Sequence, residues 1–307
     1  MSIRAQAWHA SHSFAHEDFP AAGLAAGRTQ TVSVCLPARN EAATIGPILR
    51  QLVPLIDAGA IDQIVVVDNS TDDTAEIARS LGAEVHDQEA LMPGLGPVLG
   101  KGDAMWRALA VLRGDVICFL DADSEQFGPH YAGGLIGPLL RDPAIAFVKG
   151  FYRRPFRVGD ATLPDGGGRV TELTARPLLN MFYPELAAIE QPLAGEIAAR
   201  RELLVRLPFV SGYGVDIALL LDAYHEVGLD GLAQVDLDVR QNAHQPLRDL
   251  GPMAYAVLQA VATRLEREGR LAGLLPESFL GRAEDGLRPV ASTPVERPPH
   301  AQLRIAA

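Results

Sequence analysis

Short apolar runs alternate with longer segments of helical periodicity in the first part of the chain. The runs typical of strands cover residues 31–36, 64–67, 84–86 and 116–120. The helical patterns between them cover residues 40–57 and 71–81, and a third follows a glycine-rich loop at 93–102 and ends near residue 112. Strands that are apolar on both faces and alternate with helices predict a mostly parallel sheet covered on both sides. The expected fold class is therefore α/β.

The second half of the chain continues this pattern less regularly. It predicts strands at residues 146–149 and 233–239, and helices at 170–186, from 211–216 onward and at 249–268. Because no internal repeat or linker separates the halves, we expect them to share one sheet. The folded part should be a single domain over residues 31–280. Residues 1–30 and 281–307 lack sustained periodicity and are expected to be a flexible and a disordered tail.

Composition narrows the class of protein. The 307 residues are 48% hydrophobic and 21% charged, which excludes a disordered chain. The 38 acidic and 27 basic residues give a net charge of −11, which argues against nucleic acid as a partner. We see no signal-peptide pattern and no apolar run of about 18 residues, so we expect a cytoplasmic protein that does not bind membranes. Cys35 and Cys118 are expected to be buried, reduced thiols.

Polar residues cluster where three of the predicted strands end, at 37–41, 68–70 and 121–123. In α/β sheets, ligands bind beyond the carboxyl ends of the strands. Asp121 and Asp123 directly follow a buried strand, and alternate residues project to the same side. Both carboxylates can therefore approach one divalent ion and a diphosphate bound to it. The alternative is that they cap the following helix.

The glycine-rich loop matches neither common phosphate-binding motif. Gly94, Gly96 and Gly100 miss the dinucleotide spacing, and Gly100-Lys101-Gly102 lacks the Walker spacing and its hydroxyl residue. Lys101 could still reach a diphosphate as a point charge. The alternative is a solvated surface lysine.

Several segments together resemble a known family. The segments 32–41 (VSVCLPARNE), 65–74 (VVVDNSTDDT), 100–106 (GKGDAMW) and 119–123 (FLDAD) resemble GT-A glycosyltransferases in this order. The segments 166–173 (GGGRVTEL), 192–196 (PLAGE) and 211–216 (SGYGVD) extend the resemblance to glucosyl-3-phosphoglycerate synthases and their mannosyl counterparts. The resemblance covers roughly residues 30–270 and implies a GT-A fold with a nucleotide-binding half at 31–125 and an acceptor-binding half at 126–280.

The resemblance implies a binding site for a nucleotide-sugar donor. By this comparison, Pro37, Ala38 and Glu41 hold the nucleoside, and Asp68 and Ser70 lie beside the base and ribose. The positions matched to the diphosphate and the sugar are Lys101, Asp121, Ala122, Leu193, Ala194 and Gly195. For Pro37 and Gly195, a role in tight turns alone is the alternative.

The resemblance and the chemistry together suggest catalytic and metal-binding residues. Asp216 stands at the start of a helix, where the family usually has a glutamate near the transferred sugar, and with Lys101 it is the catalytic candidate. Helix capping is its alternative. Asp121, Asp123 and His244 are the expected ligands of Mg²⁺, with Mn²⁺ as a second option, because an imidazole can complete a site held by two carboxylates. Some family members place the histidine where this chain has Asn242, and a purely structural histidine stays open.

The acceptor site is expected at a glycine turn. Residues 166–168 lead into the start of a helix, and a helix N-terminus binds phosphate readily. Arg169 can add bidentate hydrogen bonds and Thr171 a hydroxyl. By resemblance the acceptor contacts are Gly168, Arg169, Thr171, Tyr213 and Asn242. The alternative is an ordinary turn followed by a solvated arginine.

The sequence thus predicts a hexosyltransferase that acts on a phosphorylated three-carbon acid, and the resemblance favours transfer of glucose from UDP-glucose to 3-phosphoglycerate. The resemblance implies retention at the anomeric carbon and a homodimer. The first alternative is a mannosyl-3-phosphoglycerate synthase that uses GDP-mannose. The others are a transferase acting on a lipid phosphate, which should have a basic amphipathic helix or an anchor, and a silent nucleotide-sugar binding protein, which should have lost Lys101 or the aspartates.

Overall fold

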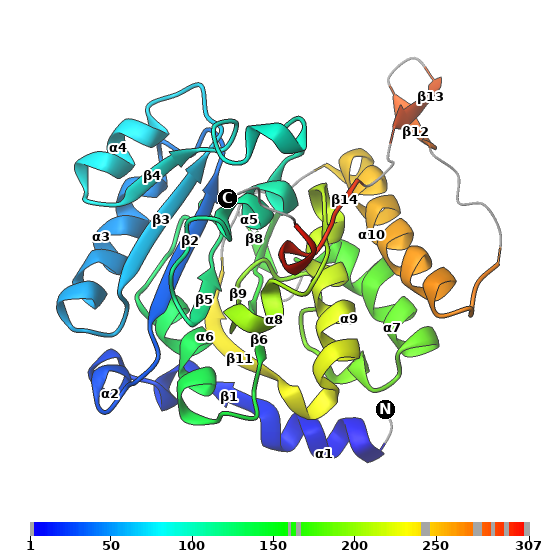
Figure 1. Ribbon diagram of the computed structural model, residues 1–307. Helices are drawn as coiled ribbons and strands as arrows, with labels where there is room; N and C mark the ends of the chain where they lie inside the picture. Colours follow the sequence, from blue (N-terminus) through cyan, green and yellow to red (C-terminus); the bar gives the residue numbers. More distant parts are fainter. Residues whose placement is uncertain are drawn as a thin grey trace.

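An eight-stranded sheet forms the centre of the computed structural model, in the order β1-β11-β6-β9-β5-β2-β3-β4 (Figure 1). The structure describes residues 3–158, 161–163, 167–240, 246–272, 278–283, 286–291 and 295–303. The strands are β1 (Ser13–Ala15), β2 (Val32–Ala38), β3 (Gln63–Asp68), β4 (Glu84–Asp87), β5 (Val116–Phe119), β6 (Phe147–Arg153), β9 (Ile197–Arg200) and β11 (Leu232–Val239). Neighbouring strands pair in parallel, except that β9 runs antiparallel to β5 and β6. The prediction that both halves share a mostly parallel sheet is confirmed.

Alternating side chains of the strands pack into two separate cores. In β3, Val65 and Val67 join one cluster, and Ile64 and Val66 join the other. One face is covered by α1 (Ile3–His12), α5 (Lys101–Ala108), α7 (Arg176–Phe182), α8 (Arg201–Leu204), α9 (Val215–Val227) and α10 (Leu247–Arg267). The other is covered by α2 (Ala21–Ala25), α3 (Ile45–Asp57), α4 (Thr74–Ser80) and α6 (His130–Arg141). Strands buried on both faces need apolar residues at successive positions, which explains the continuous apolar runs.

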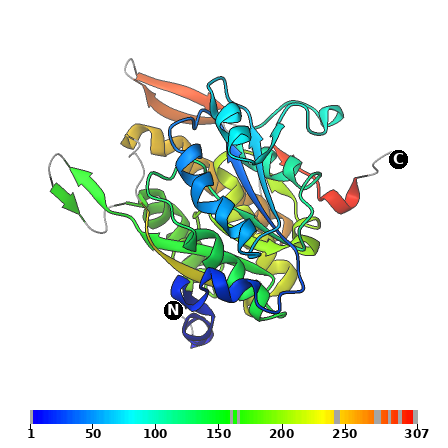
Figure 2. The ribbon, with the colours of Figure 1, turned by 90° about the vertical axis from the view of Figure 1, so that its left-hand side faces the viewer.

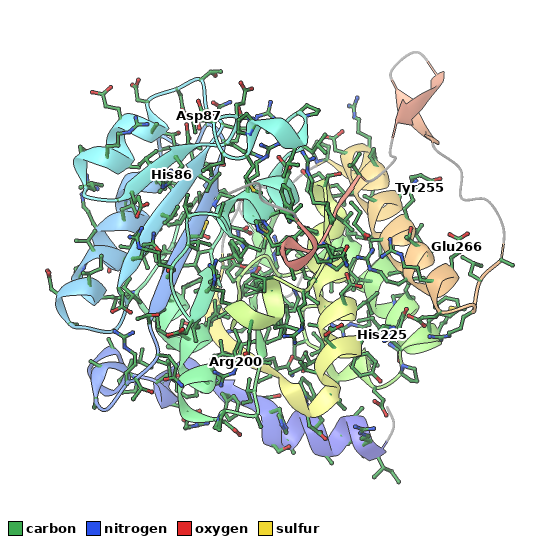
Figure 3. All side chains as sticks on the ribbon, viewed as in Figure 1. His86, Asp87, Arg200, His225, Tyr255 and Glu266 are labelled. Atoms are coloured by element: carbon green, nitrogen blue, oxygen red, sulfur yellow. The ribbon has the colours of Figure 1, made fainter. Side chains whose placement is uncertain are left out.

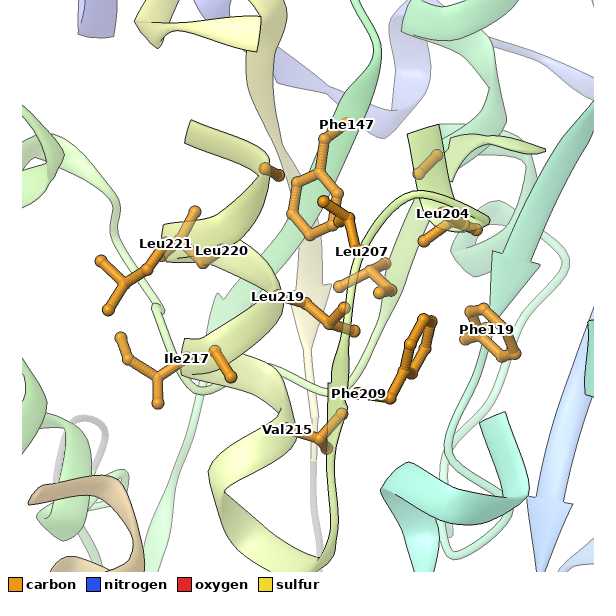
Figure 4. Packing of buried hydrophobic residues seen from close by; sticks show 14 of the residues in the cluster. Phe119, Phe147, Leu204, Leu207, Phe209, Val215, Ile217, Leu219, Leu220 and Leu221 are labelled. Carbon is orange, nitrogen blue, oxygen red and sulfur yellow. The ribbon is translucent and has the colours of Figure 1, made fainter. Parts of the chain in front are cut away.

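The first core is built around α9. Figure 4 shows its leucines near Phe147 of β6, and it shows Phe209 between α9 and Phe119 of β5. Cys35 and Cys118 are free and fully buried, as predicted, and burial raises the pKa of both thiols. No helix among the described residues is long and apolar enough to cross a membrane.

Short antiparallel ribbons lie outside the sheet. They are β7 (Phe156–Val158) with β8 (Ala161–Leu163), β12 (Ser278–Ala283) with β13 (Gly286–Ala291), and β10 (Phe209–Val210) with β14 (Glu296–Arg297). Figure 2 shows the first two projecting from the body of the molecule. At one edge of the sheet lies β4, which carries His86 and Asp87 (Figure 3).

The expectation of a flexible N-terminal tail is wrong for the described residues. Trp8 of α1 is 2% exposed, and its indole nitrogen donates to the carbonyl of Leu232 at 3.1 Å. Strand β1 then pairs in parallel with β11, with Ser13 opposite Gln234. The segment is too short for a visible sequence period. The pairing of β1 with β11 holds the segment in place and covers the edge of β11 that would otherwise be unpaired.

The expectation of disorder beyond residue 281 is wrong as well for residues 286–291 and 295–303. Strand β14 pairs with β10, and Arg297 is 8% exposed. Within the domain, the predicted helix 170–186 is a π turn (Thr171–Ala175) followed by α7, and α5 ends at Ala108 rather than near residue 112. The sequence analysis did not predict α6 or the antiparallel β9.

Candidate functional site

The predicted polar residues gather around a cavity of about 540 Å³ at the carboxyl edge of the sheet. Residues following β2 and β5 form one side of it, and the N-terminus of α5 and the segment before β9 form another. Because β9 runs opposite to its neighbours, its beginning lies at the edge where β5 and β6 end. The predicted residues that line the cavity are Pro37, Ala38, Glu41, Lys101, Asp121, Ala122, Asp123, Leu193, Gly195, Tyr213 and Asp216.

Two cations meet the carboxylates at the centre of this cavity. Lys101 Nζ lies 2.6 Å from Asp121 Oδ1 and 3.5 Å from Asp216 Oδ1. Arg240 contacts Asp121 Oδ2 at 3.0 Å and Asp123 Oδ1 at 2.7 Å. Lys101 is therefore not a solvated surface lysine. The next helix, α6, begins only at His130, so the interpretation of Asp121 and Asp123 as its caps is wrong.

The pKa values of three acids that contact Lys101 or Arg240 shift in different directions. Burial alone would raise the pKa of Asp121, but Lys101 and Arg240 hold it well below its usual range. Burial raises the pKa of Asp216 despite Lys101 and Lys149, and it raises that of Glu196 despite Arg240. Asp216 is the second residue of α9, whose N-cap is Gly214, so its carboxylate points to Lys101 instead of capping the helix.

Arg240 and Glu196 are site residues that the sequence analysis did not propose. Arg240 directly follows β11 and contacts Glu196, which directly precedes β9. Tyr152 donates its hydroxyl to Glu196 Oε2 at 2.9 Å and lies 3.0 Å from Arg240. Glu196 ends the segment 192–196 that carried the resemblance, which was an available signal. Nothing in the sequence near Arg240 indicates partners 44 and 119 positions away.

The segment before β9 approaches the acidic centre very closely. A Cβ atom at Gly195 would lie 2.3 Å from Lys101 Nζ and 2.5 Å from Asp121 Oδ2. The neighbouring carbonyl of Ala194 accepts a hydrogen bond from the buried Lys149 Nζ at 2.8 Å, and burial lowers the pKa of Lys149 to about 8. The position of Gly195 therefore requires glycine for close packing and not only for a turn.

Three predicted donor residues, Asp68, Ser70 and Ala194, do not line the cavity. Ser70 donates its hydroxyl to Asp68 Oδ1 at 2.6 Å and accepts from the Asn40 backbone amide at 2.8 Å. Asn69 between them does line the cavity. Asp68 and Ser70 thus flank a lining residue without lining the cavity themselves. Glu41 on the same side has its pKa raised by burial and by Asp123.

A second cavity of about 150 Å³ adjoins the first. The predicted acceptor residues Gly168, Arg169, Thr171 and Tyr213 line it. Gly168 has a φ of +71°, a left-handed conformation that glycine adopts without strain. Both cavities share Asp216, Leu193, Tyr213, Arg154 and Met253. Asp216 therefore stands where the two cavities meet.

The acidic pair fits a divalent cation. Asp121 and Asp123 already converge on one cationic group, Arg240, and carboxylate oxygens are the ligands that hard cations such as Mg²⁺ prefer. Among the described residues, no group of three or more acidic, histidine or cysteine side chains forms a complete metal site. The predicted third ligand, His244, and its alternative Asn242 lie outside the described residues.

A mostly parallel sheet flanked by helices, with an acidic pair directly after a central strand, is the architecture of the GT-A fold of glycosyltransferases. The chain belongs to glycosyl transferase family 2, whose model matches residues 33–190.

Two relatives share most of their length with this chain. It is 44% identical to glucosyl-3-phosphoglycerate synthase of Mycolicibacterium smegmatis over 97% of this chain and 98% of that protein. It is 42% identical to glucosyl-3-phosphoglycerate synthase of Petrotoga mobilis, over 87% and 85% of the two chains.

Two solved structures are similar over almost the whole chain. Mannosyl-3-phosphoglycerate synthase from Rubrobacter xylanophilus has a TM-score of 0.88 and 48% identity, covering 98% of each chain. Glucosyl-3-phosphoglycerate synthase from Mycobacterium tuberculosis, in complex with Mn²⁺, UDP-glucose and phosphoglyceric acid, has a TM-score of 0.81 and 40% identity, covering 94% of this chain and 98% of that one.

Proposed function

We propose that the protein transfers the glucosyl group of UDP-glucose to the free hydroxyl of 3-phosphoglycerate, with retention at the anomeric carbon and a divalent cation. The observation that carries this proposal is the pair of adjoining cavities that share Asp216. One cavity has the acidic pair suited to a metal-bound diphosphate, and the other has an arginine and a helix N-terminus suited to a phosphate. This proposal is supported by the similarity to glucosyl-3-phosphoglycerate synthases and by the complex of the Mycobacterium tuberculosis protein with UDP-glucose and phosphoglyceric acid.

The donor half of the reaction rests on Asp121, Asp123 and Lys101. The two aspartates, with His244 as third ligand by resemblance, would hold the divalent cation, which when bound neutralises negative charge on the diphosphate. Lys101 adds a fixed positive charge where the departing diphosphate develops negative charge. Pro37, Ala38 and Glu41 form the wall assigned to the nucleoside.

The transferred sugar belongs between the acidic centre and the second cavity. Asp216 and Gly195 border that space, and Leu193 lines both cavities. Because burial raises the pKa of Asp216 and Lys101 contacts it, its carboxyl group is suited to hydrogen bonds with sugar hydroxyls. We assign Asp216 the orientation of the sugar relative to the acceptor.

The acceptor phosphate is assigned to Arg169, Thr171 and the turn at Gly168, with Tyr213 and Asn242 as further contacts. Gly168, Arg169 and Thr171 line the second cavity and not the larger cavity that contains the nucleoside wall. A phosphate held there leaves the single free hydroxyl of 3-phosphoglycerate to face the donor.

The test is ligand-induced thermal stabilisation with UDP-glucose, GDP-mannose and GDP-glucose, each with and without Mg²⁺ or Mn²⁺, followed by product analysis with 3-phosphoglycerate. GDP-mannose is included because the Rubrobacter xylanophilus relative is a mannosyl enzyme. We expect stabilisation by UDP-glucose only when metal is present, and formation of glucosyl-3-phosphoglycerate. Transfer from GDP-mannose alone, or metal-independent stabilisation, would overturn the assignment of donor and metal.

Replacing Arg169 by alanine should raise the KM for 3-phosphoglycerate at least about tenfold, because loss of a charged hydrogen bond costs about 1.5 to 3 kcal/mol. The KM for UDP-glucose should change little. Steady-state kinetics with each substrate varied in turn checks this. The matched control is Arg113→Ala, an exposed arginine before β5 at the opposite edge of the sheet. Equal use of glycerate and 3-phosphoglycerate by the parent enzyme would show that no phosphate is recognised.

We further propose Mg²⁺ as the working metal and a homodimer as the functional form. Exposed Leu173, Met181 and Leu247, each more than 70% exposed, are compatible with a subunit interface. Light scattering after size-exclusion chromatography would reject the dimer if it gave the 32.8 kDa mass of one chain. The cytoplasmic location remains a prediction from the sequence, to be checked by cell fractionation.

A further inference from the structure

A buried ionic cluster lies behind the glycine-rich segment that leads to Lys101. It consists of Asp103 and Arg107 of α5 and Arg297 of β14. Asp103 and Arg107 are fully buried, and Arg297 is 8% exposed. Arg107 Nε donates to Asp103 Oδ2 at 2.8 Å, and Arg297 Nε donates to Asp103 Oδ1 at 2.5 Å. One carboxylate therefore holds two guanidinium groups in place.

The two arginines hold the backbone of the glycine-rich segment. Arg107 donates to the carbonyl of Gly96 at 2.7 Å, and Arg297 donates to the carbonyl of Pro97 at 2.6 Å and also to that of Leu95. Fixed guanidinium forks are well suited to hold several carbonyls at once. A segment rich in glycine has high conformational entropy when it is not held. These contacts therefore restrict the loop that precedes Lys101.

The same cluster reaches the wall of the donor cavity. Asp103 Oδ2 accepts from the Leu99 backbone amide at 3.2 Å and from Gln88 Nε2 at 3.0 Å. Gln88, Gly100 and Lys101 all line the cavity. The cluster itself lies behind that wall and is not among the lining residues. Its influence on a ligand is therefore indirect and passes through neighbours such as these.

Arg297 comes from a C-terminal segment that is tied to the other side of the site. Strand β14 pairs with β10, and the carbonyl of Val295 accepts from the Ser211 amide at 2.8 Å, in the segment that continues to Tyr213 and Asp216. The Trp106 indole of α5 donates to the carbonyl of Pro298 at 2.7 Å. Figure 1 shows β14 between α5 and α10. Residues 295–298, which we term the C-terminal strap, thus join α5 to the 211–216 segment.

The N-terminus of α5 has little room to shift against this ribbon. A Cβ atom at Gly102 would lie 1.9 Å from the backbone carbonyl oxygen of Val210 in β10. Lys101 therefore projects from the end of α5 that packs on β10. Strand β10 pairs with β14, and Arg297 of β14 contacts Asp103 in the same helix α5. This closed set of contacts fixes the place from which Lys101 reaches the acidic centre.

We propose that Arg297 is a positioning residue of the donor site, which sets the glycine-rich segment and Lys101 for binding the nucleoside diphosphate. The inference rests on the proposed function, because it takes the larger cavity as the donor site. Arg297 does not itself touch the ligand. Its effect should therefore appear in donor affinity and not in acceptor affinity.

The test compares Arg297→Ala and Arg297→Lys with the control Arg267→Ala, which removes the half-exposed arginine paired to the adjacent Glu296 of the strap. Isothermal titration with UDP and Mn²⁺ measures donor affinity, and hydrogen exchange measures protection of the segment from Leu95 to Lys101. We expect Arg297→Ala to weaken UDP binding about tenfold and to raise exchange in this segment. The KM for 3-phosphoglycerate should stay within about twofold of the parent value.

The Arg297→Lys variant distinguishes the contribution of the positive charge from that of the planar guanidinium group, which can donate several hydrogen bonds at once. A lysine can still pair with Asp103 but cannot hold two carbonyls in a planar geometry, so we expect an intermediate loss of UDP affinity. If Arg297→Ala unfolds at the assay temperature, UDP affinity and hydrogen exchange of Arg297→Lys test the inference instead. Parent-like UDP affinity and exchange in a folded Arg297 variant, or equal loss in Arg267→Ala, would overturn the inference. Absence of UDP binding to the parent protein would instead overturn the proposed function.

Discussion

Replacing Asp123 by alanine should reduce glucosyl transfer at least about a hundredfold while the fold stays intact. Asp123 provides one of two carboxylates that converge on a single cationic group, and its side chain is 51% exposed. Its removal takes an oxygen ligand from the proposed metal site without opening a cavity in either core. Because Arg240 keeps Asp121 and Glu196 as partners, the free energy of unfolding should change by less than about 1 kcal/mol.

Transfer rates, metal titration and thermal unfolding check this result together. The matched control is Asp57→Ala, an exposed aspartate at the end of α3 on the far side of the domain core. Excess chelator should inactivate the parent enzyme, and Mn²⁺ or Mg²⁺ should restore it. Parent-like activity of Asp123→Ala, or activity that survives chelation, would refute a metal site at this pair.

Replacing Lys101 by alanine should lower kcat about a hundredfold or more, because it removes a fixed positive charge beside the diphosphate. Burial would by itself lower the pKa of Lys101, but Asp121 and Asp216 raise it above its usual value, so the amine is charged across neutral pH. The loss should therefore be independent of pH. Kinetics at saturating UDP-glucose across neutral pH measures it, with Arg79→Ala, an exposed basic residue at the end of α4, as control.

Lys101 also forms ion pairs with two partly buried carboxylates, those of Asp121 and Asp216, so its loss should affect stability as well. With Lys101 absent, Asp216 keeps burial as the main influence on its pKa, and the raised value should rise further. We therefore expect a lower Tm for Lys101→Ala, and a smaller decrease for Lys101→Met if packing of the stem contributes. A parent-like kcat with an unchanged Tm would contradict both the catalytic assignment and the ion pairs of Lys101.

The first half of the sheet could be predicted from local pattern alone. Strands β2, β3 and β5 are buried on both faces, so each needs a continuous apolar run, and the helices between them need their own period. The polar residues after these strands could be assigned to the site because parallel strands bring their carboxyl ends to one edge. Asp121, Asp123 and Glu41 followed from that rule, Lys101 from the glycine-rich loop, and Arg169 from the glycine turn before a helix, whereas the resemblance added Asp216 and Gly195.

Only the tertiary structure showed the strands and ion-pair partners that depend on pairing between distant segments of the chain. The antiparallel insertion of β9 places Glu196 beside Arg240, and the edge of β11 orders β1, although neither short segment carries a period of its own. The C-terminal strap looked disordered because its composition is rich in proline, arginine and glutamate, yet Arg297 is buried against Asp103. A buried charge is stable only when its partner is in place, and the sequence does not state which distant carboxylate that partner is. The sequence by itself thus determined most of the parallel strands and the chemistry at their carboxyl ends. The three-dimensional fold determined the remaining strands and which distant charges hold that chemistry in position.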